Sequence, residues 1–166
     1  MIDITKISKT YTVRMLNDED LDSILKLCQG NTVFNQYWKE EPTKELLQDD
    51  MHSLPDGAEI NNKYYMGLYK DNLLVAIMSY IDQWPTSDAG CLEFFMVDIS
   101  FQGKGTGTSM LQEFFDYLKD IGRTRVVFGV VADNPQANNF LAKNGCIYLD
   151  SGVVDGFDVN IVGKML

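Results

Sequence analysis

The stretch of the sequence best suited to chemistry is a run of alternating glycines between a predicted strand and a predicted helix. It reads Gln102-Gly103-Lys104-Gly105-Thr106-Gly107-Thr108. Glycine lets a backbone approach a ligand closely, and the N–H groups at the start of a helix point toward an anion. Lys104 adds a positive charge, and the stretch contains no acidic residue. The pattern therefore predicts a turn that binds a phosphate group, rather than an ordinary turn between a strand and a helix.

Two common phosphate-binding motifs fit this stretch poorly. The Walker motif requires Ser or Thr after its Gly-Lys pair, whereas Gly105 follows Lys104 here. The dinucleotide fingerprint requires G-x-G-x-x-G with an acidic residue about 20 positions further on, and the spacing here is G-x-G-x-G. Asp133 lies too far along the chain for that role. A dinucleotide-binding oxidoreductase therefore stays open only as an alternative.

A closer match comes from three segments taken together. Residues 102–107 resemble the Q/R-x-x-G-x-G/A signature of the GNAT (Gcn5-related N-acetyltransferase) superfamily. Residues 94–99, Phe-Phe-Met-Val-Asp-Ile, resemble the fourth strand of that family, which pairs with pantetheine. Residues 134–145 resemble the next helix of the family. That segment contains Asn134-Pro135-x-Ala137 and Phe140-Leu141-x-Lys143-x-Gly145.

The resemblance implies an N-acetyltransferase that moves an acetyl group from acetyl-coenzyme A to a primary amine, by direct attack in a ternary complex. Main-chain amides of residues 103–108 would hold the pyrophosphate, and the strand around Val97 and Ile99 would bond the pantetheine. Asn134 would reach the pantetheine arm, act as the helix N-cap before Pro135, or do both. The cofactor-binding residues implied are Val97, Ile99, Gln102, Gly103, Lys104, Gly105, Thr106, Gly107, Thr108, Asn134, Phe140 and Lys143.

One position departs from the family pattern. The tyrosine proposed as general acid in the family is replaced by Leu141, which has no proton to give. Either another group such as Tyr148 or water serves, or no acid is needed, because a thiol with a pKa of about 8.5 leaves readily as thiolate. Leu141 also keeps a second alternative open, in which a non-catalytic module of the same fold binds acetyl-coenzyme A as a sensor.

A base is expected, because an alkyl ammonium with a pKa of about 10.4 attacks only after losing a proton. Glu93 is the candidate catalytic residue, and strict alternation along its predicted strand places it on the same face as Cys91 and Phe95. The alternative is a solvated charge on the strand. His52, the only histidine, is more typical of a surface residue, and Cys91 has no base beside it in the sequence.

The elements that must position these residues follow from hydrophobic periodicity. The predicted order β-α-α-β-β-β-α-β-α-β-β gives an α/β fold, a GNAT-like mixed sheet of about six to seven strands flanked by about four helices. Residues 31–41 are predicted to form an irregular loop. Predicted strands are 11–16, 63–69, 73–81, 91–99, 125–131, 146–149 and 157–162. Predicted helices are 21–28, 43–54, one that the glycine-rich stretch opens and that runs to 121, and a short one that starts at Asn134-Pro135 and stops at Asn144-Gly145.

Composition narrows the class of protein. The chain has 166 residues, 45% of them hydrophobic, which suits a single acetyltransferase-like domain over residues 1–166. A net charge of −10 argues against nucleic-acid partners and anionic membranes. The sequence has no apolar leader and no long apolar run, so it predicts a cytoplasmic protein. Three widely spaced cysteines without a C-x-x-C pair predict neither a disulfide framework nor a metal site.

The acidic residues concentrate in one segment. Residues 17–59 contain eleven acidic and three basic residues, a charge of −8. Two interpretations are open: solvated helix faces, or a field that attracts a cationic amine to the acceptor side. The expected acceptor is a small-molecule amine, with or without a positive charge, or a protein amine. The resemblance also allows a homodimer. Aromatic residues that either line the acceptor site or fill the core are Tyr37, Trp38, Tyr64, Tyr65, Tyr80 and Trp84.

Overall fold

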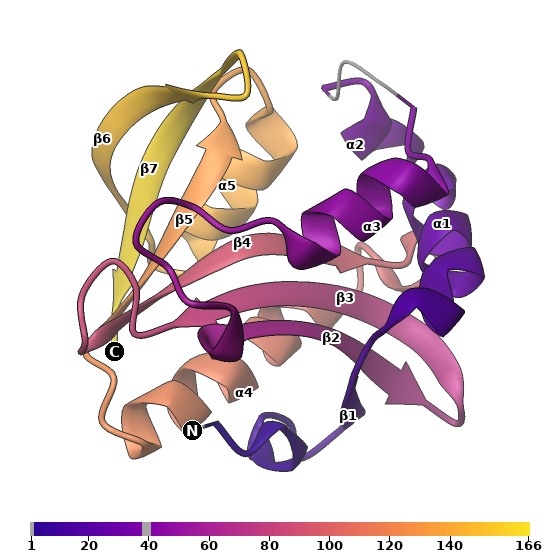
Figure 1. Ribbon diagram of the computed structural model, residues 1–166, viewed down its shortest axis with the longest axis horizontal. Helices are drawn as coiled ribbons and strands as arrows, with labels where there is room; N and C mark the ends of the chain where they lie inside the picture. The colour runs from indigo at the N-terminus through magenta and orange to yellow at the C-terminus, as the bar shows by residue number, and fades with distance from the viewer. Residues whose placement is uncertain (1, 38–40) are drawn as a thin grey trace.

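The computed structural model describes residues 2–37 and 41–166, and its centre is one mixed, seven-stranded sheet (Figure 1). The strands are β1 (Thr12–Met15), β2 (Lys63–Lys70), β3 (Leu73–Asp82), β4 (Ala89–Val97), β5 (Arg125–Val131), β6 (Ile147–Val154) and β7 (Phe157–Met165). Their order in the sheet is β1-β2-β3-β4-β5-β7-β6. Only β4 and β5 pair in parallel; the other neighbours are antiparallel. The predicted α/β fold class is confirmed.

Helices cover both faces of the sheet (Figure 1). They are α1 (Leu21–Gly30), α2 (Thr32–Asn35), α3 (Lys44–His52), α4 (Thr106–Asp120) and α5 (Pro135–Lys143). Ile24 of α1 and Leu47 of α3 pack on one face against Ile77 of β3. Phe114 of α4 and Leu141 of α5 belong to the core on the other face. Among the described residues, no helix is long and apolar enough to cross a membrane.

Several strand boundaries differ from the predictions; β7, for example, runs to Met165 rather than ending at 162. Strand β4 ends at Val97 instead of the predicted residue 99, and Ile99 lies in a 3-10 turn, Ile99–Phe101. The turn begins here because the Asp98 side chain accepts a hydrogen bond from the Ser100 N–H at 2.9 Å. Strand β6 runs on to Val154, because it stays paired with β7 up to the final turn.

Residues 31–41, predicted to be an irregular loop, contain the short helix α2. The reason is tertiary packing: the ring of Phe34 meets Phe94 of β4 edge to face, with 5.9 Å between the ring centroids. Sequence periodicity over four residues is too short to reveal such a turn. Residues 38–40 of the same segment lie outside the described residues.

The two parallel strands stay together for only part of their length. Residues 89–92 of β4 pair with residues 125–128 of β5, yet β4 continues to Val97 and β5 to Val131. Figure 1 shows the two strands running apart beyond this point. The second half of β4 therefore has a main-chain edge that β5 does not cover. This opening positions the site described below.

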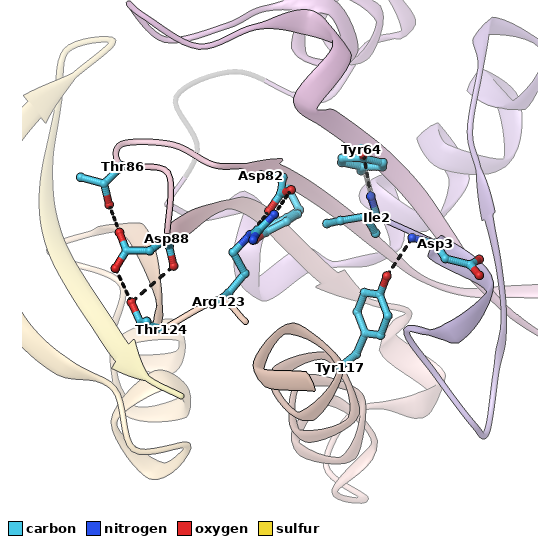
Figure 2. A network of polar contacts seen from close by, with 10 residues as sticks. Ile2, Asp3, Tyr64, Asp82, Thr86, Asp88, Tyr117, Arg123 and Thr124 are labelled. Carbon is cyan, nitrogen blue, oxygen red and sulfur yellow. Dashed lines mark hydrogen bonds and ion pairs between the residues drawn. The ribbon is translucent and has the colours of Figure 1, made fainter. Parts of the chain in front are cut away.

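A buried ion pair secures the closed end of the opening (Figure 2). Arg123, in the turn before β5, donates from Nε and Nη2 to the two carboxylate oxygens of Asp82 at the end of β3, each at 2.6 Å. The Tyr80 hydroxyl adds a hydrogen bond to the same carboxylate at 3.2 Å. Beside it, Thr124 Oγ1 donates to the Asp88 carboxylate at 2.7 Å. These bonds fix the start of β5 against the connection between β3 and β4.

The Arg123–Asp82 pair is expected to contribute strongly to stability. Arg123→Met leaves the Asp82 carboxylate, with 2% of its side chain exposed, without its cation. Such a loss costs about 3–5 kcal/mol in the free energy of unfolding, measurable by urea denaturation. The matched control is Arg14→Met, which breaks a bidentate pair with Asp20 in which 47% of the arginine side chain is exposed. That change costs about 1 kcal/mol or less; equal losses in the two variants would contradict this account.

Candidate active site

A cavity of about 300 Å³ lies where β4 and β5 part. Its walls come from β4, from the glycine-rich turn and first turn of α4, from the start of α5, and from the residues that follow α1. The lining residues are Asn31, Phe34, Phe95, Met96, Val97, Gln102, Gly103, Gly105, Thr106, Gly107, Thr108, Asn134, Gln136, Ala137 and Phe140. The structure therefore brings together most of the residues that the sequence analysis assigned to the cofactor.

The glycine-rich turn has the backbone of an anion-binding site. Gly103 and Gly105 have φ angles of +72° and +79°, which favour glycine, and a Cβ at either position would meet no atom within 4 Å. Gly105 is the N-cap of α4 and has no side chain to accept from the first turn. The N–H groups of residues 106–108 have no intrahelical acceptor, so they can bind an anion at the mouth of the cavity.

Gly107 brings α4 close to the apolar wall of the cavity. A Cβ at Gly107 would stand 3.2 Å from the Phe140 ring and 3.5 Å from Val97. Phe140 in turn stacks on Phe95, with 6.3 Å between ring centroids and 24° between the planes. The glycine is required here for close packing rather than for its φ angle. Phe95, which the sequence analysis did not assign to the cofactor, completes this wall.

The edge of β4 that faces the opening carries main-chain groups. The Asp98 N–H donates to the Val75 carbonyl of β3 at 2.8 Å. In an antiparallel strand, successive residues direct their main-chain N–H and C=O groups to opposite sides, so those of Val97 and Phe95 point away from β3. The Val97 carbonyl already accepts from Gln102 Nε2 at 2.8 Å and from Asn31 Nδ2 at 3.3 Å. At Val97, the N–H is therefore the group left for a ligand.

Asn31 is a second residue that sequence analysis missed. It is buried at the end of α1, and its amide bonds the Leu27 carbonyl at 3.1 Å as well as Val97. Its Oδ1 also accepts from Gln102 Nε2. An asparagine just after a helix is a recognised signal for a helix C-terminus. Nothing in the local sequence indicates that Asn31 also bonds Val97 and Gln102, which follow it by 66 and 71 positions.

The other predicted cofactor residues differ in their placement. Asn134 is buried in the cavity wall, and its Oδ1 accepts from Ala137 N–H at 3.1 Å, so its N-cap role is confirmed. Ile99, Lys104 and Lys143 are exposed and are not part of the cavity lining. Lys104 Nζ donates to the Ser100 carbonyl at 2.9 Å, beside the glycine-rich turn.

Glu93 lies in a β-bulge, and this corrects one expectation. Ser79 is opposite Phe94 and Tyr80 is opposite Leu92, which leaves Glu93 as the extra residue of β4. Alternation is broken at that point, so Glu93 shares a face with Cys91, as expected, but not with Phe95. Phe95 packs with the core under α4 instead. A period-two pattern assumes regular pairing and misses a bulge.

The Glu93 carboxylate has defined partners. Oε2 accepts from Ser79 Oγ at 2.9 Å and lies 3.0 Å from Lys63 Nζ, while 22% of the side chain is exposed. Two weaker candidates lose support. His52 is exposed and lies 3.4 Å from Asp18, and burial raises the pKa of the Cys91 thiol to about 12, so the thiolate is scarce at neutral pH.

Neither Tyr148, the proposed replacement for the family tyrosine, nor any described acidic residue of the segment 17–59 lines the cavity. Leu141 is buried in the core, and Tyr148 is 62% exposed on the edge strand β6. From residues 17–59, only Asn31 and Phe34 line the cavity among the described residues. Lys39 and Glu40 of that segment lie outside the described residues.

Of the aromatic residues left open between the acceptor site and the core, three are core residues. Tyr64, Tyr65 and Tyr80 are 9%, 2% and 0% exposed. Tyr37 is half-buried, and the half-buried Trp84 donates from its indole to the Asp56 carbonyl at 3.2 Å. Trp38, which was grouped with them, lies outside the described residues.

Comparison with known proteins agrees with this geometry. A model of the acetyltransferase (GNAT) family matches residues 27–146. An uncharacterized N-acetyltransferase of Methanocaldococcus jannaschii is 25% identical, with 94% of this chain and 68% of the relative covered. An acetyltransferase structure from Thermus thermophilus matches at a TM-score of 0.77 and 20% identity, covering 95% of this chain and 97% of that one. A RimL ribosomal alpha-N-protein acetyltransferase in complex with coenzyme A gives 0.72 at 18% identity, with 99% and 98% covered.

The family match spans the glycine-rich turn, the parting of β4 and β5, and α5, and it ends just before β6. None of these comparisons supports the dinucleotide-binding oxidoreductase considered from the sequence. The chain therefore belongs to the GNAT acetyltransferase family and is an acetyl-coenzyme A-dependent acyltransferase.

Proposed function

We propose that the protein transfers an acetyl group from acetyl-coenzyme A to a primary amine by direct attack in a ternary complex, with Glu93 as the base. The observation that carries this proposal is the cavity in the opening between β4 and β5. At one end of it lies an anion-binding helix start, and at the other lies the stretch of β4 that follows the Glu93 bulge. Such a cavity suits a long cofactor with phosphate at one end and a reactive group at the other.

The proposed contacts follow from the groups that face the cavity. N–H groups of residues 103–108 bind the pyrophosphate, and main-chain groups of Val97 and Phe95 bond the pantetheine arm along the strand edge. Gln102 holds the end of β4 in place through the Val97 carbonyl. Phe140 and the Asn134 amide contact the same arm from α5. Contacts of Ile99, Lys104 and Lys143 with the cofactor remain predictions from the sequence.

Glu93 would supply what the amine lacks. At neutral pH an alkyl amine is almost entirely protonated, since its pKa is about 10.4. Glu93 accepts that proton, directly or through a water molecule, as the nitrogen lone pair attacks the thioester carbonyl. The thiolate leaves with a pKa of about 8.5, so the reaction needs no dedicated acid where the family tyrosine is replaced by Leu141.

The acceptor is proposed to be a cationic amine, either a small molecule or a protein N-terminus. The support is the charge of −8 over residues 17–59, carried largely on α1, α3 and the loops around them, in a chain of net charge −10. Among the similar structures, one is of a ribosomal alpha-N-protein acetyltransferase. Location in the cytoplasm and assembly as a homodimer are part of the same proposal.

A panel of acceptors tests the function directly. Release of coenzyme A thiol is measured with polyamines, amino acids, aminoglycosides and peptides with a free N-terminus. We expect turnover with at least one acceptor, and a several-fold fall in kcat/KM for polycationic acceptors as salt rises from about 50 to about 500 mM. Tight acetyl-coenzyme A binding without turnover on any acceptor would instead favour the sensor alternative. A kcat/KM that is insensitive to salt would remove the role of the acidic segment.

The anion-binding turn is tested by Gly105→Asp. The substitution adds a side chain at φ +79° and a negative charge at the start of α4, so acetyl-coenzyme A affinity is expected to fall at least about 100-fold in calorimetry. The control is Gly122→Asp, which adds the same side chain at φ +84° just after the same helix, where no atom lies within 4 Å either. If both variants bind equally, the phosphate site is elsewhere.

The base is tested by Glu93→Gln. We expect kcat to fall about 10²–10⁴-fold at neutral pH and much less near pH 10, where the amine is already deprotonated. The KM for acetyl-coenzyme A should change little, because Glu93 is outside the cavity lining. The exposed Glu59→Gln serves as the control for loss of one negative charge. A pH–rate profile identical to that of the wild type would exclude Glu93 as the base.

A further inference from the structure

Lys63, the first residue of β2, is a buried cation that the proposed mechanism leaves unused. Its side chain is 2% exposed, and all three N–H groups of its ammonium have acceptors. Nζ lies 3.0 Å from Glu93 Oε2, 2.6 Å from the Asp50 carbonyl and 2.7 Å from the Ser53 carbonyl. A buried ammonium is costly unless every donor is satisfied, so this arrangement holds Lys63 in one position.

The contacts of Lys63 join two parts of the molecule. The carbonyls of Asp50 and Ser53 belong to the last turn and C-cap of α3, where the unpaired carbonyls of a helix favour a cation. The third contact is to the carboxylate in the β4 bulge. Lys63 therefore fixes the position of Glu93 relative to α3, the helix that packs over this face of the sheet.

Both side-chain contacts of Glu93 are to the same oxygen. Lys63 Nζ and Ser79 Oγ bind Oε2, and in the described part of the chain no protein group binds Oε1. One oxygen of the carboxylate is thus anchored, while the other is left to take part in proton transfer. An anchored carboxylate with one available oxygen suits a general base, which must lie within hydrogen-bond reach of the proton that it accepts.

The charges around Glu93 come from several elements. Asp50 faces it from α3, Lys63 and Tyr65 from β2, Cys91 from β4, and Cys28 of α1 lies behind Tyr65. Burial raises the pKa of Asp50, Lys63 lowers it, and the negative charge of Glu93 raises it again. Lys63 is the only cation among these groups. Without it, two carboxylates would face each other in a poorly solvated site, where one of them would hold a proton.

We propose that Lys63 is a positioning residue for the reaction: it anchors Oε2 of Glu93 and supplies the positive charge beside this carboxylate, so that Oε1 can accept the proton of the acceptor amine. In that step the N–H bond of the ammonium breaks and an O–H bond forms at Oε1, while Lys63 keeps all of its own protons. The inference rests on the proposed role of Glu93 as the base.

The test compares pH–rate profiles of Lys63→Gln and Lys63→Arg. Glutamine keeps an N–H donor but removes the charge, so the acidic limb of kcat/KM for the amine should move to higher pH by about one unit or more. At a pH on that limb, activity should fall about tenfold, with KM for acetyl-coenzyme A unchanged. Arginine retains the charge and should leave the limb near its wild-type position. A purely structural role would lower activity at every pH and leave the limb in place.

A double variant separates this inference from the proposed function. If Lys63 acts through Glu93, the profile of the double variant Lys63→Gln, Glu93→Gln matches that of Glu93→Gln alone. Multiplying losses would overturn the inference, as would an unshifted limb in Lys63→Gln. A wild-type profile in Glu93→Gln would overturn both the base and the role of Lys63. Thermal unfolding confirms that each variant is folded. If Lys63→Gln does not fold, Lys63→Met, which also removes the charge, takes its place: a limb moved to higher pH supports the inference and an unshifted limb overturns it.

Discussion

The site depends on one constraint, the end of hydrogen bonding between β4 and β5 after Leu92 and Phe128. Had the parallel ladder continued, the main chain of Phe95 and Val97 would be occupied by β5, and no cavity would exist. A strand edge in a protein interior must be paired or solvated, and the proposed pantetheine contact would pair this one. The Arg123–Asp82 pair closes the opening at one end, and the glycine-rich turn lies at the other.

The charge of the molecule is unevenly distributed between the glycine-rich turn and the segment 17–59. The chain is strongly acidic, yet residues 102–108 contain no acid, and the start of α4 offers N–H groups and a partial positive charge. On the opposite face of the sheet, Lys63 contacts the Glu93 carboxylate and two carbonyls at the end of α3, and residues 17–59 carry a charge of −8. In the proposed function, the start of α4 therefore faces the anionic cofactor, the acidic segment attracts a cationic acceptor, and β4 lies between them.

The parts of the site that sequence analysis could predict are those set by local chemistry. The alternating glycines before an amphipathic helix predict an anion-binding turn from a few neighbouring residues. Asn134 before a proline likewise predicts a helix N-cap. The bulge at Glu93 could not be predicted, because it exists only in the pairing of β4 with β3. The Lys63–Glu93 contact joins positions 30 residues apart in the chain, and the bonds of Asn31 span longer separations still. Long-range polar contacts leave no periodic trace in a sequence.

The Val97 carbonyl, bonded by both Gln102 and Asn31, has a consequence for the thermodynamics of binding. These bonds already join the end of α1, the end of β4 and the start of the glycine-rich turn before any ligand arrives. The conformational entropy of this turn is therefore lost when the protein folds, so ligand binding carries no further entropic cost for ordering it. The free and ligand-bound forms should thus share one backbone geometry at this turn, which makes the proposed cofactor site preorganised.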